Sequence, residues 1–193
     1  NSPVVKSAPM KVKDKEIHQL VKEIIIPCRN LLEFLRQMVQ LFNHVSDTKF
    51  EPIDLEKLVK LSNMEEWILQ TFQVFQTNIH SEMEKYQLYN IVIHIKNFIN
   101  NLSKCYVNSC KLMMKTSNKN EVSESIRYLS VYYHVFSNFT ITVAPFIPFI
   151  SEYLYLNIIE IITNNIDLGN PISVHFQQMN KNIRKVDNNF LKY

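Results

Sequence analysis

The stretch QLYNIVIHIKNFINNLSKCYVNSCKLMMK, residues 87–115, carries the clearest pattern in the chain. Its apolar residues recur at steps of three and four, which is the period of one face of an α-helix. The residues of this apolar face are Leu88, Ile91, Val92, Ile95, Phe98, Ile99, Leu102 and Tyr106. The opposite face is polar, and lysines gather toward and just beyond the C-terminal end, at Lys104, Lys111, Lys115 and Lys119. We therefore expect a long core helix with a positively charged end.

The composition of the 193 residues favours helices over sheets. The chain has a single glycine, Gly169, whereas hairpin turns and bulges of a sheet draw on glycine repeatedly. Hydrophobic residues make up 46% of the chain, which excludes disorder by composition and allows one core with tails. The formal net charge of +3 permits a polyanionic partner without requiring one.

Cysteine usage and hydropathy argue against a disulfide-linked framework and against a membrane-spanning protein. Three cysteines, Cys28, Cys105 and Cys110, give no paired spacing, so we expect a reducing compartment rather than a disulfide framework. The most apolar run, residues 139–162, is split by prolines, so no membrane span is expected. The chain opens on asparagine without a methionine, which is typical of a piece of a longer protein.

Further helices are expected on both sides of the central one. A helix begins near Asp14 and is kinked or broken at Pro27, where the backbone lacks a donor. A polar loop follows at residues 44–52, then a short helix at residues 54–61. Asn63 and Glu66 have the spacing of a capping box, with Asn63 as the N-cap of a second long helix.

The C-terminal half predicts two more helices and a short extended piece. One helix covers about residues 121–144, and a corner with two prolines leads into another that starts at Pro148 and ends near residue 162. Residues 172–176 are apolar and are expected to form a lone strand. The sequence thus predicts an all-α antiparallel helical bundle over residues 14–162. An extended N-terminal connector at residues 1–13 precedes it, and a polar tail at residues 163–193 follows.

No catalytic or metal-binding motif is recognisable in the chain. One glycine cannot form a phosphate-binding loop, and Cys105 and Cys110 lie five residues apart on a helix and face different directions. His80 and Glu84 have the spacing of an acid–base pair, but an exposed helix face explains them better. We expect no catalysis and no metal from these residues. From physical reasoning alone, the lysines at the end of the central helix are either phosphate ligands or a solvated helix end.

Several stretches resemble one family, in the same order and over nearly the whole chain. They are Asn1-Ser2-Pro3-Val4-Val5; Ile24-Ile25-Ile26-Pro27; Met64-Glu65-Glu66-Trp67-Ile68-Leu69; Glu82 to Asn90; Phe98-Ile99-Asn100-Asn101-Leu102 with Tyr106-Val107; Ala144-Pro145-Phe146-Ile147-Pro148-Phe149; and Ser173-Val174-His175-Phe176. The chain resembles the anticodon-binding helical bundle of isoleucyl-tRNA synthetases, class I enzymes, of the eukaryotic type. The Ala-Pro-Phe-x-Pro-Phe corner is shared by several class I synthetases, whereas the opening and ending stretches point to the isoleucine enzyme.

The resemblance implies a module that binds the anticodon stem and loop of isoleucine tRNA in translation. The parent enzyme would be a cytoplasmic isoleucine–tRNA ligase that uses ATP and Mg²⁺, with no catalytic site and no cofactor in this part of it. The partner is tRNA and not a membrane, and the resemblance does not identify other synthetase subunits. The tRNA-binding residues it implies, at the family's central helix, are Lys104, Tyr106, Asn108, Lys111 and Lys115.

The chain departs from the family at this same place. The family has Asn-Trp-Tyr-Val-Arg and further arginines where this chain has Lys104, Cys105, Tyr106, Val107 and Asn108. Arginine's planar fork suits bases and phosphates better than the point charge of lysine. Two alternatives stay open. One is the same module from a valyl- or leucyl-tRNA synthetase, and the other, motivated by the missing arginines, is a helical protein-interaction module without tRNA contact.

Overall fold

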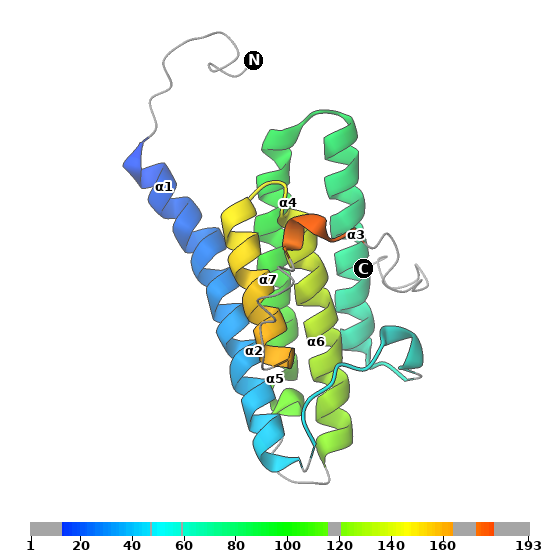
Figure 1. Ribbon diagram of the computed structural model, residues 1–193. Coiled ribbons are helices and arrows are strands. Elements are labelled where there is room, and N and C mark those ends of the chain that lie inside the picture. Colours follow the sequence, from blue (N-terminus) through cyan, green and yellow to red (C-terminus); the bar gives the residue numbers. More distant parts are fainter. Residues whose placement is uncertain (1–12, 47, 59, 116–120, 164–172, 180–193) are drawn as a thin grey trace.

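Helices make up most of the part of the chain that this computed structural model describes, which is residues 13–46, 48–58, 60–115, 121–163 and 173–179. The long helices run side by side along one common direction (Figure 1). Within the described ranges there is no β-strand. The predicted all-α class is confirmed.

The first helical arm consists of α1 (Asp14–Leu20), a π-helical segment η2 (Val21–Ile25) and α2 (Ile26–Val45). The start at Asp14 is confirmed, and α2 continues two residues into the expected loop. Pro27 lies in the first turn of α2 and does not break the helix. The wider turns of η2 precede the proline, and such turns accommodate an interruption of the regular hydrogen-bond pattern.

The second long helix, α3 (Asn63–Glu84), starts one residue earlier than the sequence pattern indicated. Its N-cap is Ser62, whose Oγ accepts a hydrogen bond from the Glu65 backbone N–H at 3.3 Å. The Glu65 carboxylate in turn accepts one from the Ser62 backbone N–H at 2.7 Å. The predicted box of Asn63 and Glu66 is therefore wrong by one residue, because serine and glutamate satisfy the same spacing immediately upstream. The expected helix at residues 54–61 is only a 3₁₀ turn, η3 (Leu55–Lys57).

Replacing Ser62 with alanine should lower the free energy of unfolding by about 1 kcal/mol, because the Glu65 N–H loses its acceptor. Asn63→Ala is the matched control and should cost less than about 0.5 kcal/mol, since Asn63 is an exposed residue inside the helix. Urea unfolding followed by circular dichroism measures both. A larger cost for Asn63→Ala than for Ser62→Ala would contradict this assignment of the cap.

The central helix is confirmed as one continuous helical stretch with a π-helical middle. It comprises α4 (Leu88–Asn100), η4 (Asn101–Val107) and α5 (Asn108–Met114). Tyr86, in the turn from α3, has a positive φ of 55°. The predicted apolar face is buried except at Leu88 and Val92, which are 54% and 37% exposed. These two expectations are wrong because the α3–α4 hairpin extends past the ends of α6 and α7, so no helix covers its tip from that side (Figure 1).

The last two long helices are α6 (Val122–Val143) and α7 (Pro148–Thr163), which confirms the corner and Pro148 as a helix start. The expected strand is wrong where it is described, because Val174–Phe176 forms a 3₁₀ turn, η6, while Ile172 lies outside the described residues. The Val174 N–H donates to the Glu152 carboxylate at 2.9 Å. This contact fixes η6 on α7 as a turn, and no neighbouring strand pairs with it within the described ranges.

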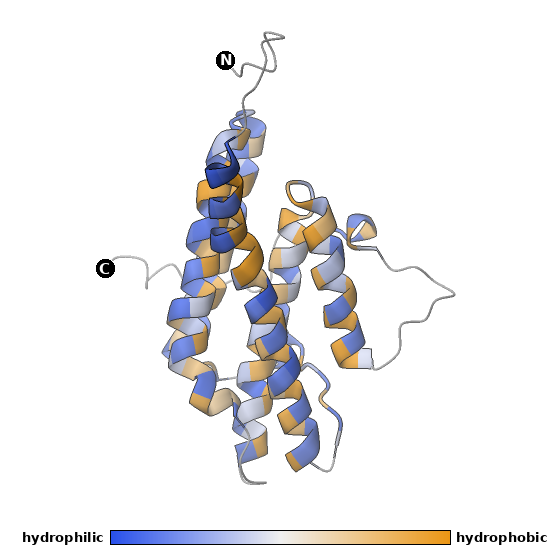
Figure 2. Cartoon of the chain, turned by 90° about the vertical axis from the view of Figure 1, so that its left-hand side faces the viewer, coloured by the Kyte–Doolittle hydropathy of each residue, from blue (hydrophilic) through white to orange (hydrophobic). Residues whose placement is uncertain are grey.

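The core is a stack of aromatic rings from α3, α4 and α6. Phe98 of α4 stacks on Phe75 of α3 with 4.7 Å between ring centroids, and on Phe139 of α6 at 5.2 Å. Figure 2 shows apolar and polar residues alternating around the helices, as expected when each helix buries one face. In the described part of the chain, none of the helices combines the length and the apolarity needed to cross a bilayer.

Candidate nucleic-acid interface

A polar stripe runs along the C-terminal half of the central helix. Lys104 of η4, Asn108 and Lys111 of α5, and Lys115 at its end follow one another at steps of four, three and four, and all four are exposed. Asn108 and Lys111 share one side of α5, whereas Lys104 lies in the wider turns of η4 just before them. The stripe therefore presents three positive charges and one amide to the surrounding solution.

The three lysines of this stripe have no acidic partner among the described residues. In contrast, Lys57 lies 3.0 Å from Asp54, and Lys96 is paired with Glu23 across α4 and η2. Unpaired, exposed ammonium groups are available to an anion that arrives from solution. The geometry therefore allows this end of the helix to hold phosphates as point charges.

Tyr106, the remaining residue implied by the resemblance, lies in the core with none of its surface exposed. Its hydroxyl donates to the Tyr128 carbonyl at 3.3 Å, and burial raises the pKa of this phenol well above its ordinary value. The ring is thus a packing element between η4 and α6. Lys104, Asn108, Lys111 and Lys115 are all exposed within the last turns of the central helix, whereas Tyr106 is not accessible to a ligand.

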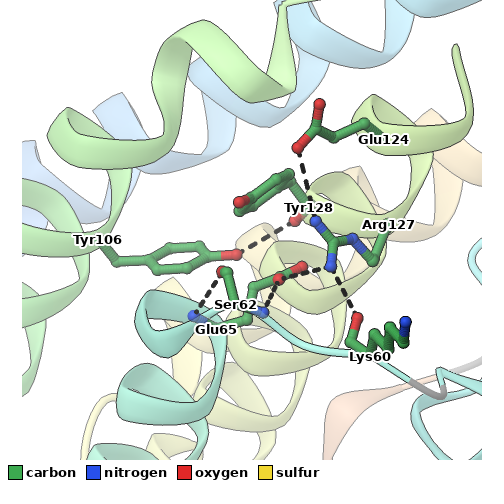
Figure 3. A network of polar contacts seen from close by, with 7 residues as sticks. All are labelled: Lys60, Ser62, Glu65, Tyr106, Glu124, Arg127 and Tyr128. Carbon is green, nitrogen blue, oxygen red and sulfur yellow. Dashed lines mark hydrogen bonds and ion pairs between the residues drawn. The ribbon is translucent and has the colours of Figure 1, made fainter. Parts of the chain in front are cut away.

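A network of polar contacts surrounds the buried carboxylate of Glu65 (Figure 3). Glu65 of α3 has no exposed surface, and its carboxylate lies 3.4 Å from Nη1 of Arg127 on α6. The same nitrogen donates to the Lys60 carbonyl at 2.7 Å, and Nη2 lies 3.6 Å from Glu124. Arg127 also lies over the Tyr128 ring at 4.8 Å. The network therefore joins the start of α3 to α6 beside the Tyr106 contact.

The end of α5 is also tied to α6. The Ser125 hydroxyl donates to the Met114 carbonyl at 2.7 Å, and the Lys115 N–H donates to the Lys111 carbonyl at 3.1 Å. These bonds satisfy backbone groups that a helix end otherwise leaves without partners. They hold the last turn, with Lys111 and Lys115, in a defined position. Sequence reasoning did not identify Arg127, Glu65 and Ser125 as residues that support this end of the bundle. Only Glu65 had a signal in the sequence, because Ser62 and Glu65 have the spacing of a capping box.

The structure also places the other residues that the sequence offered as candidates for catalysis or metal binding. His80 and Glu84 lie 3.2 Å apart, but both side chains are 68% exposed on one helix face. Cys105 is exposed while Cys110 is buried, so they do face different directions, and burial raises the pKa of the Cys110 thiol to about 11. No cluster of metal-ligating side chains occurs within the described residues.

Comparison with known proteins gives a family match and several related sequences. A family model described as the anticodon-binding domain of tRNA ligase matches residues 65–192. The chain is 32% identical over 163 residues to the cytoplasmic isoleucine–tRNA ligase of Saccharomyces cerevisiae, covering 84% of this chain. It is 30% identical over 158 residues, 82% of this chain, to a probable cytoplasmic isoleucine–tRNA ligase of Dictyostelium discoideum. The matched region spans only 15% of the length of each of these two relatives.

Proposed function

The chain belongs to the family of anticodon-binding domains of tRNA ligases, and from that premise we propose that it binds the anticodon stem and loop of an isoleucine tRNA. The choice of isoleucine as the amino acid of that tRNA rests on the relatives, which are isoleucine–tRNA ligases in several organisms. The observation that carries the proposal is the stripe of Lys104, Asn108, Lys111 and Lys115, which are all exposed near the C-terminal end of the central helix. Its lysines are free of acidic partners among the described residues.

The binding energy would come chiefly from contacts of the lysines with phosphates. Such contacts release counterions from the nucleic acid, so the affinity falls as salt rises. At a rise of about 1.5 Å per residue, Lys104 and Lys111 lie about 10 Å apart along the helix axis, and Lys111 and Lys115 about 6 Å apart. This spread lets the stripe follow a strand over more than one nucleotide. Asn108 adds an uncharged group that both donates and accepts hydrogen bonds.

The longer protein to which this domain would contribute is a cytoplasmic isoleucine–tRNA ligase. It would join isoleucine to its tRNA with ATP and Mg²⁺, in parts of the polypeptide other than the residues described above. The bundle would hold the anticodon end of the tRNA while the acceptor end lies in the active site. The activity, the nucleotide and the location are proposals that rest on the names of the relatives.

Reversing the charge of Lys111 and Lys115 together, as Lys111→Glu and Lys115→Glu, should lower the affinity for isoleucine tRNA at least tenfold near 0.1 M salt. The reason is that two phosphate contacts are lost and replaced by repulsion. Filter binding or fluorescence anisotropy with labelled tRNA measures the affinity. A circular dichroism melt should show an unchanged bundle, because both side chains are exposed.

Lys85→Glu is the matched control for this experiment. Lys85 is exposed and lies in the turn between α3 and α4, at the opposite end of the central helix from Lys111 and Lys115. It changes the net charge in the same direction without touching the stripe. A loss of affinity per substitution that is as large in the control as in the double variant would mean that only overall charge matters and would count against the proposed surface.

A further inference from the structure

The connection between α2 and α3 lies across α6 (Figure 1). Its residues 48–58, called the strap below, form no regular structure apart from the single 3₁₀ turn η3. Three apolar side chains of the strap are nevertheless buried: Phe50 is 2% exposed, Leu55 5% and Leu58 6%. The strap therefore covers part of the core, and the contacts that hold it on α6 keep water away from these side chains.

Ile53 is the point at which the strap is bonded to α6. Its backbone N–H donates to the Ser130 hydroxyl at 2.9 Å, and its carbonyl lies 2.9 Å from Nε2 of His134. A carbonyl only accepts hydrogen bonds, so Nε2 of the imidazole carries the hydrogen. Ser130 and His134 are four residues apart and thus neighbours on one side of α6. Two side chains of α6 therefore satisfy both backbone polar groups of Ile53, which no helix or sheet pairs.

The surroundings of His134 favour the neutral imidazole. The ring is only partly exposed, and the Tyr133 ring meets it edge-on with 5.2 Å between centroids. In the described part of the chain, the charged group that acts on His134 is the carboxylate of Asp54, which lies 3.0 Å from Nζ of Lys57. Burial lowers the pKa of His134 below its ordinary value of 6.5, although the Ile53 carbonyl and Asp54 oppose this shift.

We propose that the contact of His134 with Ile53 is a pH-sensitive device, in which the neutral imidazole holds the strap on α6 and protonation releases it. A protonated ring would carry a positive charge in a partly buried place where the nearby carboxylate is already paired with a lysine. Turning out into water relieves that cost, but Nε2 then no longer reaches the carbonyl of Ile53. Release of the strap would expose Phe50, Leu55 and Leu58 to solvent.

The sign of the pH dependence follows from the two states of His134. With the strap released, the imidazole is solvated and has its ordinary pKa of 6.5. With the strap in place the pKa is lower, so the released state binds the proton more tightly. The released fraction should therefore rise as the pH falls below 6.5, and it should level off below the pKa of the closed state.

Amide hydrogen exchange of the 193-residue chain, followed by NMR, tests the proposal. The Ile53 and Phe50 N–H groups are both hydrogen-bonded in the closed strap, the second to Asn43 at 2.6 Å. Their protection factors, corrected for intrinsic exchange, should fall about threefold to tenfold from pH 7.5 to pH 5.5. Tenfold is the limit because the released imidazole titrates one pH unit above the lower pH. Equal protection at both pH values overturns the proposal.

His134→Gln removes the titrating group but keeps an N–H donor. Protection of the strap in this variant should not change with pH, whether the glutamine holds the strap closed or leaves it open. His44→Gln is the matched control, since His44 is an exposed histidine at the end of α2, just before the strap. It should show the same pH dependence as the unaltered chain. A pH dependence that persists in His134→Gln, or that disappears in His44→Gln, overturns the assignment to His134.

Discussion

Replacing Phe98 with alanine is expected to lower the free energy of unfolding by about 3–5 kcal/mol, the usual range for a buried phenylalanine. The ring is 2% exposed and meets three others, Phe72 at 5.4 Å, Phe75 at 4.7 Å and Phe139 at 5.2 Å. Alanine would remove all three ring contacts at the point where α3, α4 and α6 meet, and it would leave a cavity there. Urea denaturation with a linear extrapolation measures the change.

Tyr89→Ala is the control for this prediction. Tyr89 is an aromatic residue of the same helix but is 73% exposed, so its loss should change the free energy of unfolding by less than about 0.5 kcal/mol. A cost below about 1 kcal/mol for Phe98→Ala would contradict the aromatic stack as the centre of the core.

Arg127→Met should lower the free energy of unfolding by about 3 kcal/mol, because it leaves the carboxylate of Glu65 buried without a counter-charge. Glu65 has no exposed surface, and Arg127 Nη1 is also the donor to the Lys60 carbonyl. Methionine keeps much of the length and apolar stem of arginine, so the loss of charge and hydrogen bonds dominates. Thermal and urea unfolding both measure the effect.

The double variant Arg127→Met with Glu65→Gln separates the buried charge from the packing. Glutamine removes the charge of Glu65 but keeps a side-chain oxygen. That oxygen can still accept the hydrogen bond that the Ser62 N–H donates to Glu65 at 2.7 Å. Much of the lost stability should therefore return, since a buried neutral amide costs far less than a buried unpaired carboxylate. If Glu65→Gln added to the loss instead, the ionic contact with Arg127 would not explain the effect of Arg127→Met.

The helices could be predicted from the sequence because apolar periodicity and prolines act locally. Asp14, Pro148 and the central helix of residues 87–115 all lie where the pattern indicated. The predictions were wrong where the structure of a residue depends on contacts that the sequence pattern does not show. Two overlapping cap spacings competed at the start of α3, and only the observed contacts of Ser62 decide between them. Leu88 continues the apolar face, yet it lies beyond the helices that could have covered it.

The candidate interface was predictable to a similar extent. The lysine stripe follows from spacing along one helix, whereas contacts between helices depend on which distant residues meet. The ionic contact of Glu65 with Arg127, for example, joins α3 to α6. Tyr106 shows a limit of the family resemblance: the resemblance implied a tRNA-binding residue, but the side chain lies in the core.

The claim that the lysine stripe holds RNA phosphates is tested most directly by the salt dependence of binding. Affinity for isoleucine tRNA and for an unrelated tRNA is measured over a range of salt concentrations, with the unaltered chain and with the Lys111→Glu and Lys115→Glu double variant. The logarithm of the affinity should fall linearly with the logarithm of salt, and the slope of the variant should be shallower by about 2, one for each lysine. Equal slopes for the two proteins, or negligible binding of both tRNAs by the unaltered chain, would contradict the claim.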